Sequence, residues 1–195
     1  MKKQIRQGVF ETNSSSVHSI SIINDSYKPN NLPQEFIIRT NGEFGWEVDT
    51  YDSPQDKAAY LYQAIVAYDP RESNSNLSND EKLKIKQNLL NTFINNLESF
   101  GINVICKHKF AKIIHFSHYD YIAFVNENNE ESKGYLDHGS EAKHLVDFVL
   151  SSKENTLKFI FDNRCYIDSG NDNDDRYGDG ICRNYGDSTI IIKDN

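Results

Sequence analysis

The sequence predicts a single α+β domain in which about three helices pack on a mostly antiparallel or mixed sheet. The chain has 195 residues, of which 37% are hydrophobic and 12% aromatic, so it can bury a core of ordinary size. Two segments combine helix caps with apolar residues at helical spacing, and several short β-branched and aromatic runs lie between turns. Because no low-complexity linker divides the chain, we expect residues 1–195 to form one domain.

The first part of the chain is predicted to form strands. Polar and apolar residues alternate over 17–23 after a turn rich in Asn and Ser, which indicates a strand. Two further runs, Glu35–Thr40 and Phe44–Val48, flank Asn41-Gly42, and this dipeptide suits the two-residue primed turn of a β-hairpin. We therefore expect one strand followed by a hairpin.

Two helices are predicted next. Ser53 can cap the first helix and Pro54 suits its first position, so we expect a helix from there to about Ala67. Ser78 and Glu81 match a capping box, and the apolar residues after them recur at helical spacing until Gly101. These caps make the two helices the best-defined elements of the sequence.

The second half of the chain is predicted to contain more strands and a third helix. Runs of β-branched and aromatic residues predict strands over Ile102–Lys107, Phe110–Phe116 and Tyr119–Val125. The pattern then predicts, in order, a helix over Ser140–Leu150, a strand over Thr156–Phe161, a long loop over Asp162–Asp187 and a strand over Ser188–Lys193.

The charge and the cysteine content narrow the class of protein. Lys and Arg number 21 against 29 Asp and Glu, a net charge of −8, which argues against direct nucleic-acid binding because that binding needs clustered cations. The three cysteines are an odd number and do not match a secreted disulfide framework. Neither a signal peptide nor a membrane-spanning apolar run is present in the sequence. We therefore expect a protein of the bacterial host cytoplasm that binds no membrane.

An Asp-rich segment is the first candidate for a site. Between Asp162 and Asp187 the chain carries seven aspartates against three arginines, and oxygen ligands on a loop suit a hard cation such as Mg²⁺ or Ca²⁺. The alternative is a solvated acidic loop in which Asp and Asn side chains form local turns. The solvated loop is the simpler interpretation, and we expect no bound cofactor.

Four sulfur and imidazole side chains form a second candidate: Cys106, His108, His115 and His118. Cys106 and His108 would share one face of a strand, and the turn at Lys109-Phe110 could bring His115 opposite them, as a structural zinc site requires. The spacing matches no common zinc finger. The alternative places Cys106 in the core and leaves the histidines half exposed.

Three short polar segments lie at predicted turns, far apart in the sequence. They are Thr12–His18 (TNSSSVH), Gly134–Ser140 (GYLDHGS) and Ser169–Asn173 (SGNDN). On these segments the chain resembles a family of uncharacterised phage and prophage proteins of Firmicutes, which open with E-T-N-S-S-S-x-H and tend to carry a D-H-x-S turn and a G-N-D-N turn. The resemblance covers both ends of the chain and implies a phage or mobile-element origin without implying an activity.

If the three segments meet, they form a polar cluster with two imidazoles and two carboxylates. Its members are Asn13, Ser14, His18, Asp137, His138, Asn171 and Asp172. Such groups could perform general acid–base catalysis or hold a divalent ion, with His18, Asp137 and His138 as the catalytic residues. In the structural alternative, the polar side chains bond the backbone of their own turns, and buried His and Asp satisfy each other.

Origin, size and charge together favour a binding role over an enzymatic one. We expect a small acidic phage accessory protein that binds and inhibits a host protein, such as a nucleic-acid-handling defence enzyme, in the manner of an anti-CRISPR. The binding residues would be Asn13, Ser14, Asn171, Asp172, Asp174 and Asp175. Their carboxylates could occupy a basic nucleic-acid channel as phosphates do. The alternative is a small hydrolase or transferase that uses the His/Asp cluster, with or without a metal.

Overall fold

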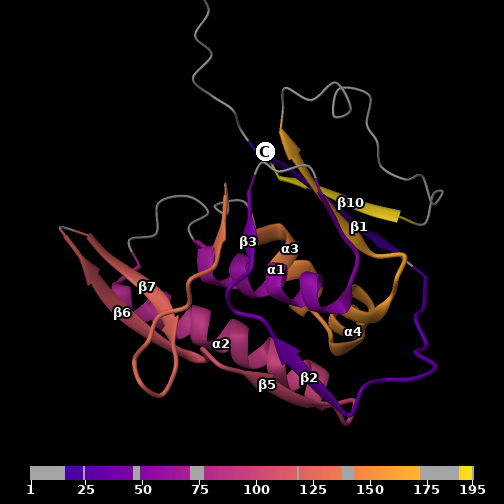
Figure 1. Cartoon of the computed structure of the whole chain (residues 1–195), viewed down its shortest axis with the longest axis horizontal. Coiled ribbons are helices and arrows are strands. Elements are labelled where there is room, and N and C mark those ends of the chain that lie inside the picture. Colours follow the sequence, from indigo (N-terminus) through magenta and orange to yellow (C-terminus); the bar gives the residue numbers. More distant parts are fainter. Residues whose placement is uncertain are drawn as a thin grey trace, which may run out of the picture.

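The chain folds as one α+β domain, as the sequence predicts (Figure 1). The computed structural model describes residues 16–23, 25–45, 49–70, 77–117, 119–137, 143–171 and 189–194. The helices in these ranges are α1 (Pro54–Ala67), α2 (Asn79–Glu98), α3 (Lys143–Leu150) and α4 (Lys153–Phe161). The strands are β1 (Ser16–Ile23), β2 (Glu35–Ile38), β3 (Glu43–Phe44), β4 (Asp49–Tyr51), β5 (Asn103–Cys106), β6 (Phe110–Phe116), β7 (Tyr119–Val125), β8 (Tyr135–Leu136), β9 (Tyr166–Asn171) and β10 (Thr189–Asp194).

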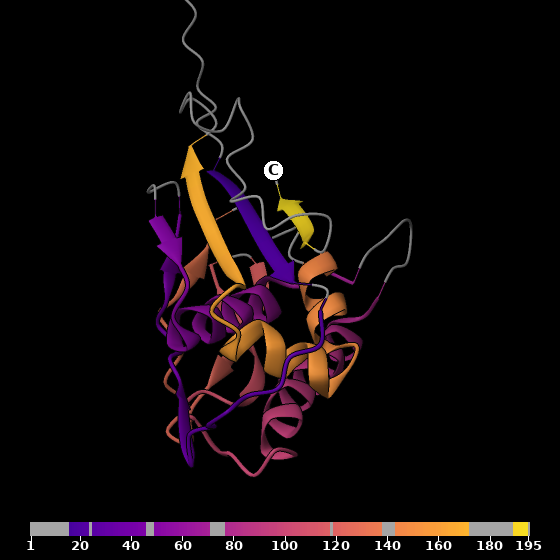
Figure 2. The ribbon, with the colours of Figure 1, turned by 90° about the vertical axis from the view of Figure 1, so that its right-hand side faces the viewer.

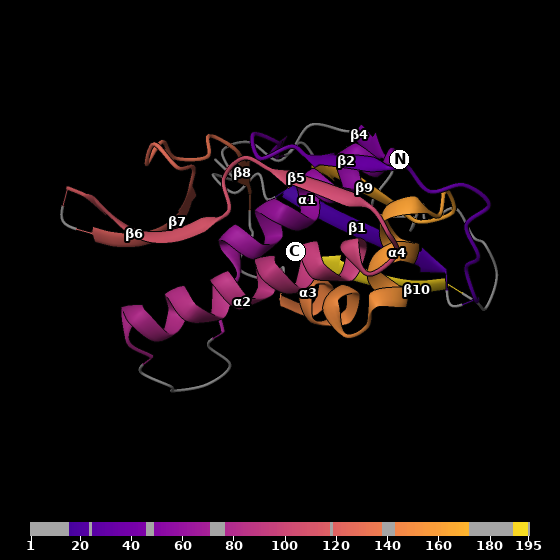
Figure 3. The same ribbon diagram turned by 90° about the horizontal axis from the view of Figure 1, so that it is seen from below.

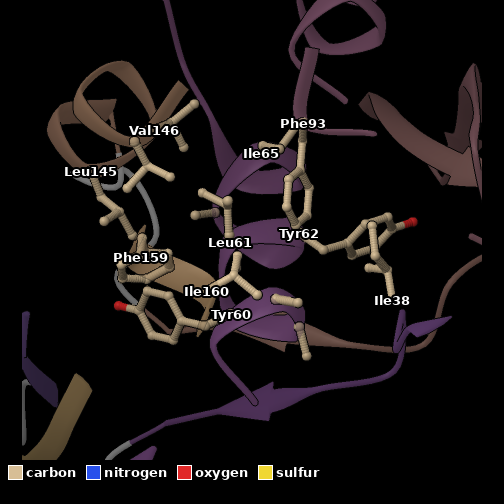
Figure 4. Packing of buried hydrophobic residues seen from close by; sticks show 14 of the residues in the cluster. Ile38, Tyr60, Leu61, Tyr62, Ile65, Phe93, Leu145, Val146, Phe159 and Ile160 are labelled. Carbon is tan, nitrogen blue, oxygen red and sulfur yellow. The ribbon is translucent and has the colours of Figure 1, made fainter. Parts of the chain in front are cut away.

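Helix α1 lies at the centre of the core and contacts α2, α3 and α4. Nine consecutive residues from Lys57 to Ile65 are buried, so this helix is enclosed on all sides and not only along one apolar face. Figure 4 shows Leu61 of α1 surrounded by side chains of α3 and α4, while Tyr62 points towards Ile38 of β2. Any polar side chain in this stretch of α1 must therefore find a partner inside the protein.

The largest sheet joins the beginning of the chain to its end. Its four strands are antiparallel in the order β10-β1-β9-β4. Figure 2 shows β1 and β9 side by side, with the helices grouped below them. In the register of these two strands His18 lies opposite Ser169 and Ile20 lies opposite Ile167. Ile20, Ile22 and Ile167 are all buried in the core, so this sheet closes one side of it.

Three two-stranded sheets complete the described part of the fold. β2 pairs with β5 and β3 pairs with β8, both in parallel, and these pairs place Phe36 and Phe44 in the core. β6 and β7 form an antiparallel hairpin at one edge of the molecule, beside α2, as Figure 3 shows from below. At its base this hairpin rests on α2, where the Gln87 side chain donates to the Lys109 carbonyl and accepts from the Ala111 amide.

The two helices with sequence caps begin where they were predicted to begin. The Ser53 side chain accepts a hydrogen bond from the Asp56 amide, and the capping box of Ser78 and Glu81 is complete. Just beyond α2, Gly101 has φ of 82°, a conformation that favours glycine. The strands predicted over 17–23, 102–107, 110–116, 119–125 and 188–193 are confirmed as β1, β5, β6, β7 and β10, and the predicted third helix is confirmed as α3.

The strand predicted over Thr156–Phe161 is wrong, because this segment belongs to helix α4. Its aromatic and β-branched residues suggested a strand, but the Ser152 side chain caps a helix by accepting from the Asn155 amide. Leu157, Phe159 and Ile160 are buried, so packing in the core outweighs the local preference for strand. This helix also raises the number of helices in the described ranges to four, where about three were expected.

The hairpin predicted over residues 35–48 is also wrong. β2 and β3 lie in different sheets and pair with β5 and β8. Gly42 is not among the residues with positive φ, which a primed turn would require at this position. Its lack of a side chain serves packing instead, since a Cβ here would lie 2.6 Å from the Phe44 ring. Residues 46–48 lie outside the described ranges.

The long loop predicted over Asp162–Asp187 begins with a strand. β9 covers Tyr166–Asn171 and is an inner strand of the four-stranded sheet, between β1 and β4. Residues 172–188 lie outside the described ranges. None of the helices in the described part of the chain is both long and apolar enough to cross a bilayer.

Lys57 is the charged residue that the core encloses most completely. Its Nζ donates to the carbonyls of Asp162 (2.7 Å) and Cys165 (2.9 Å), in the turn between α4 and β9. Burial lowers the pKa of Lys57 from 10.5 to about 8, partly offset by the nearby Cys165 and Asp162. Lys57 therefore ties the first half of the chain to the strand that passes through the centre of the sheet.

We predict that Lys57→Met removes a pH-dependent part of the stability. Above pH 8 the unfolded chain binds more protons at this site than the folded one, so the wild type gains stability as pH rises through the window from 8 to 10.5. The free energy of unfolding, wild type minus variant, is expected to rise by about 2 kcal/mol from about pH 7.5 to about pH 9.5 in urea titrations. Taking this difference cancels Lys86, whose pKa burial also lowers to about 8. A difference that is constant across the window would contradict the role given to Lys57.

Candidate functional site

The structure describes three of the residues expected in the polar cluster. His18 lies in β1, Asp137 follows β8, and Asn171 is the last residue of β9, where it pairs with Ser16. Asn13, Ser14, His138, Asp172, Asp174 and Asp175 lie outside the described ranges. The pairing of Ser16 with Asn171 brings the first and third polar segments to the same end of the sheet.

His18 is buried, with 3% of its surface exposed, and hydrogen bonds hold both of its ring nitrogens. Nδ1 lies 2.6 Å from the Tyr60 hydroxyl, and Nε2 lies 3.3 Å from the Gly45 carbonyl. Because a carbonyl can only accept, Nε2 donates to Gly45, and Nδ1 bonds the Tyr60 hydroxyl. This geometry supports the structural alternative for His18, since each nitrogen is already engaged; its catalytic role stays a prediction.

Asp137 lies near the same point of the backbone. Its amide donates to the Phe44 carbonyl at 2.8 Å, and the next residue, Gly45, supplies the carbonyl that His18 bonds. Asp137 of the second polar segment and His18 of the first therefore bond the carbonyls of two consecutive residues, Phe44 and Gly45. The cluster hypothesis depends on the three segments meeting, and the described residues connect parts of them through the pairing of Ser16 with Asn171 and through the bonds of Phe44 and Gly45.

The structure describes three of the four residues considered for zinc, and it does not bring them together. Cys106 ends β5, and its Sγ lies 3.5 Å from the buried His108's carbonyl. β6 pairs with β7 and not with β5, so His115 forms an exposed pair with Asp120 (2.8 Å) instead of facing Cys106. His118 lies outside the described ranges. Across the described residues, no group of three or more His, Cys, Asp or Glu side chains is arranged to hold a metal ion.

The β6–β7 hairpin carries a feature that the sequence interpretation missed. Pairing of Phe116 with Tyr119 and of Ile114 with Tyr121 places alternate residues on the same face. The aromatic members of this face are Phe110, Phe116, Tyr119 and Tyr121, with 45%, 69%, 79% and 38% of their surface exposed. We call these four residues the aromatic face. These aromatic residues are visible in the sequence of 110–121, but they served only to predict strands.

Near its base, the opposite face of the hairpin is covered. Ala111 and Phe124 form a pair in the register, and Phe124 belongs to the buried core while Ala111 packs against it. The hairpin is therefore anchored near its base, and the exposure of the aromatic face is a property of the folded protein.

A cleft beside the hairpin was missed as well. Thr40, which follows β2, lies 2.6 Å through Oγ1 from Nδ1 of His108, which follows β5. The two residues are 68 positions apart, and no sequence pattern links them. Their contact depends on the parallel pairing of β2 with β5, which the sequence did not predict.

Comparisons with known proteins supply no further guide. No protein-family model, no curated protein sequence and no solved structure matches the chain.

We predict that Tyr60→Phe destabilises the protein, because it removes the hydroxyl that forms a hydrogen bond with the buried ring of His18. The expected loss in the free energy of unfolding is about 1 to 3 kcal/mol, measured by urea titration. Tyr119→Phe is the matched control, since its side chain is 79% exposed, and it should change stability by less than about 0.5 kcal/mol. Equal stability of Tyr60→Phe and wild type would show that His18 is not held as described.

Proposed function

We propose that this protein binds a host protein of the bacterial cytoplasm through the aromatic face and inhibits it. In keeping with the expected origin and charge, the proposed target is a nucleic-acid-handling defence enzyme. The exposure of four aromatic side chains on one side of an anchored hairpin is the observation that carries this proposal.

The size and chemistry of the aromatic face favour a protein partner. Phe and Tyr side chains offer large, rigid contact areas with few rotatable bonds, and Tyr is enriched among the residues that dominate binding energy. Exposed apolar patches in a folded domain commonly mark interaction sites. The pair of Phe116 and Tyr119 at the tip has the largest exposed fractions among the exposed large hydrophobic side chains of the described residues. A partner that covered this pair would gain free energy from burying it.

The hairpin is held in a shape ready for binding. The Gln87 side chain bonds the backbone of β6 on both sides of Phe110, and Phe124 fixes β7 in the core. A surface that is ordered before binding loses less conformational entropy on association. The hairpin lies at one edge of the molecule, so a partner can reach its exposed side chains (Figure 3).

Net charge supports the choice of partner. A protein of net charge −8 associates faster with a basic surface, and enzymes that handle nucleic acids carry basic channels. Asp172, Asp174 and Asp175 remain the predicted source of carboxylates for such a channel, outside the described ranges. In this proposal the aromatic face provides the binding affinity, and the acidic residues speed the association with the basic surface of the partner.

The test is affinity capture with the tagged full chain in a lysate of a Firmicutes host, with mass spectrometry as the readout. The wild type should retain one host protein at near-stoichiometric yield. Phe116→Ser/Tyr119→Ser should weaken binding to the purified partner about 100-fold or more, because two central aromatic contacts are lost. Added in equal amount, the wild type should also stop the partner's enzymatic activity.

Ile37→Ser/Ile105→Ser is the matched control, since it removes two exposed apolar residues that pair across β2 and β5, away from the hairpin. It should bind like the wild type. Equal loss of binding in both double variants would contradict the aromatic face as the docking surface. A partner that binds but keeps its activity would contradict inhibition.

A further inference from the structure

The cleft that contains Thr40 and His108 has the dimensions of a small-molecule site. Its volume is about 970 Å³, and three segments form its walls: Thr40 and Asn41, Lys107 and His108, and residues 130–134. Ligand pockets commonly measure about 300 to 1,000 Å³. The cleft is therefore large enough for a molecule of mononucleotide size.

Two walls of this cleft are fixed to the central helix. The Tyr62 hydroxyl donates to the His108 carbonyl at 2.9 Å, and Gln63 Nε2 donates to the Thr40 carbonyl at 3.1 Å. The Ser132 hydroxyl, from the third wall, donates to the same Thr40 carbonyl. These buried bonds keep all three walls in register before any ligand arrives.

Gly134 closes the third wall against the same anchor. A Cβ at this position would lie 2.0 Å from Gln63 Nε2 and 2.5 Å from the Gly42 carbonyl oxygen, so the wall could not pack here with a larger residue. The backbone of residue 134 therefore touches the group that holds Thr40 in place. The cleft is built by close packing and not by a gap between loose loops.

His108 presents one ring nitrogen to the cleft. The Thr40 hydroxyl bonds Nδ1 of this ring, and Nε2 has no hydrogen-bond partner among the described residues. Ser21 Oγ is the buried side-chain N or O atom that lacks a partner in these residues, so Nε2 of His108 is accessible and not buried. Burial, and next the charge of Lys107, lower the pKa of His108, which favours the neutral ring.

The charged side chains that line the cleft differ in whether they have hydrogen-bond partners within the protein. The Glu130 carboxylate accepts from Asn126 Nδ2 at 2.5 Å, and the Glu131 carboxylate accepts from the Tyr121 hydroxyl at 2.7 Å. Within the described ranges, Lys107 and Lys133 take part in no hydrogen bond or ion pair. The two carboxylates therefore have hydrogen-bond partners within the protein, whereas the two exposed lysines that line the cleft have none in the described ranges.

We infer that this cleft binds a small phosphorylated molecule, whose phosphate lies between the ammonium groups of Lys107 and Lys133 and accepts a hydrogen bond from His108 Nε2. Lysine binds phosphate as a compact point charge, and a neutral imidazole N–H adds direction. The remaining volume accommodates the organic part of the ligand beside Asn41 and Ser132. This site uses residues that are not part of the aromatic face.

The test is a titration of the full chain, followed by the NMR signals of the His108 imidazole at constant ionic strength. The probes are inorganic phosphate, adenosine 5′-monophosphate, adenosine and succinate. Phosphate and the monophosphate should shift the His108 Nε2 signal, with the monophosphate binding more tightly, and adenosine should not shift it. The inference would be overturned if neither phosphate nor the monophosphate shifted the His108 Nε2 signal. It would also be overturned if succinate bound as tightly as phosphate.

Substitutions of the two lysines test whether phosphate binds in this cleft. Lys107→Gln/Lys133→Gln should weaken phosphate and monophosphate binding about tenfold or more, because two charge contacts are lost. Lys84→Gln on α2 is the matched control, an exposed lysine outside the cleft, and it should bind like the wild type. Both variants change exposed positions, so their circular dichroism should match that of the wild type. Unchanged affinity in the double variant would overturn the inference.

Discussion

Polar side chains carried into the core by helix α1 are the constraint on which the rest of the structure depends. Each of them bonds a different part of the chain: Lys57 bonds the turn before β9, Tyr60 bonds His18 of β1, Tyr62 bonds His108 after β5, and Gln63 bonds Thr40 after β2. A buried polar group without a partner costs about 1 to 3 kcal/mol, so these partners cannot be exchanged freely. The helix therefore sets the positions of segments that are more than a hundred residues apart.

This constraint acts differently on the two proposed sites. The cleft depends on α1 directly, because Tyr62 and Gln63 hold the backbones of His108 and Thr40. The hairpin depends on α2, through Gln87, and on the packing of Phe124. One site is thus fixed from the centre of the molecule, and the other lies at its edge, where a protein partner can reach it.

Local signals made much of the fold predictable from the sequence. Ser53 and the capping box of Ser78 and Glu81 lie next to the backbone groups that they bond, so α1 and α2 were predictable. Strand pairing was not, because the partners of β2 and β3 are distant in sequence and only the folded chain brings them together. Helix α4 was misjudged because its residues favour strands, and burial of Phe159 and Ile160 decides the outcome.

The same limit applies to the sites. The sequence of 110–121 contains the aromatic residues of this face, but which side of the hairpin would face the core required the position of α2. The cleft joins residues from three distant segments and left no pattern in the sequence. The polar cluster was a hypothesis that depended on three distant turns meeting, and the bonds of His18 to Tyr60 and Gly45 could not be foreseen.

Amide hydrogen exchange of the full chain under native conditions tests the central role of α1 most directly. If α1 organises the fold, its amides from Tyr60 to Ile65 exchange only through global unfolding, with the same free energy as the urea titration gives. Exchange of these amides through a smaller opening, while those of β1 and β9 stay protected, would contradict this account.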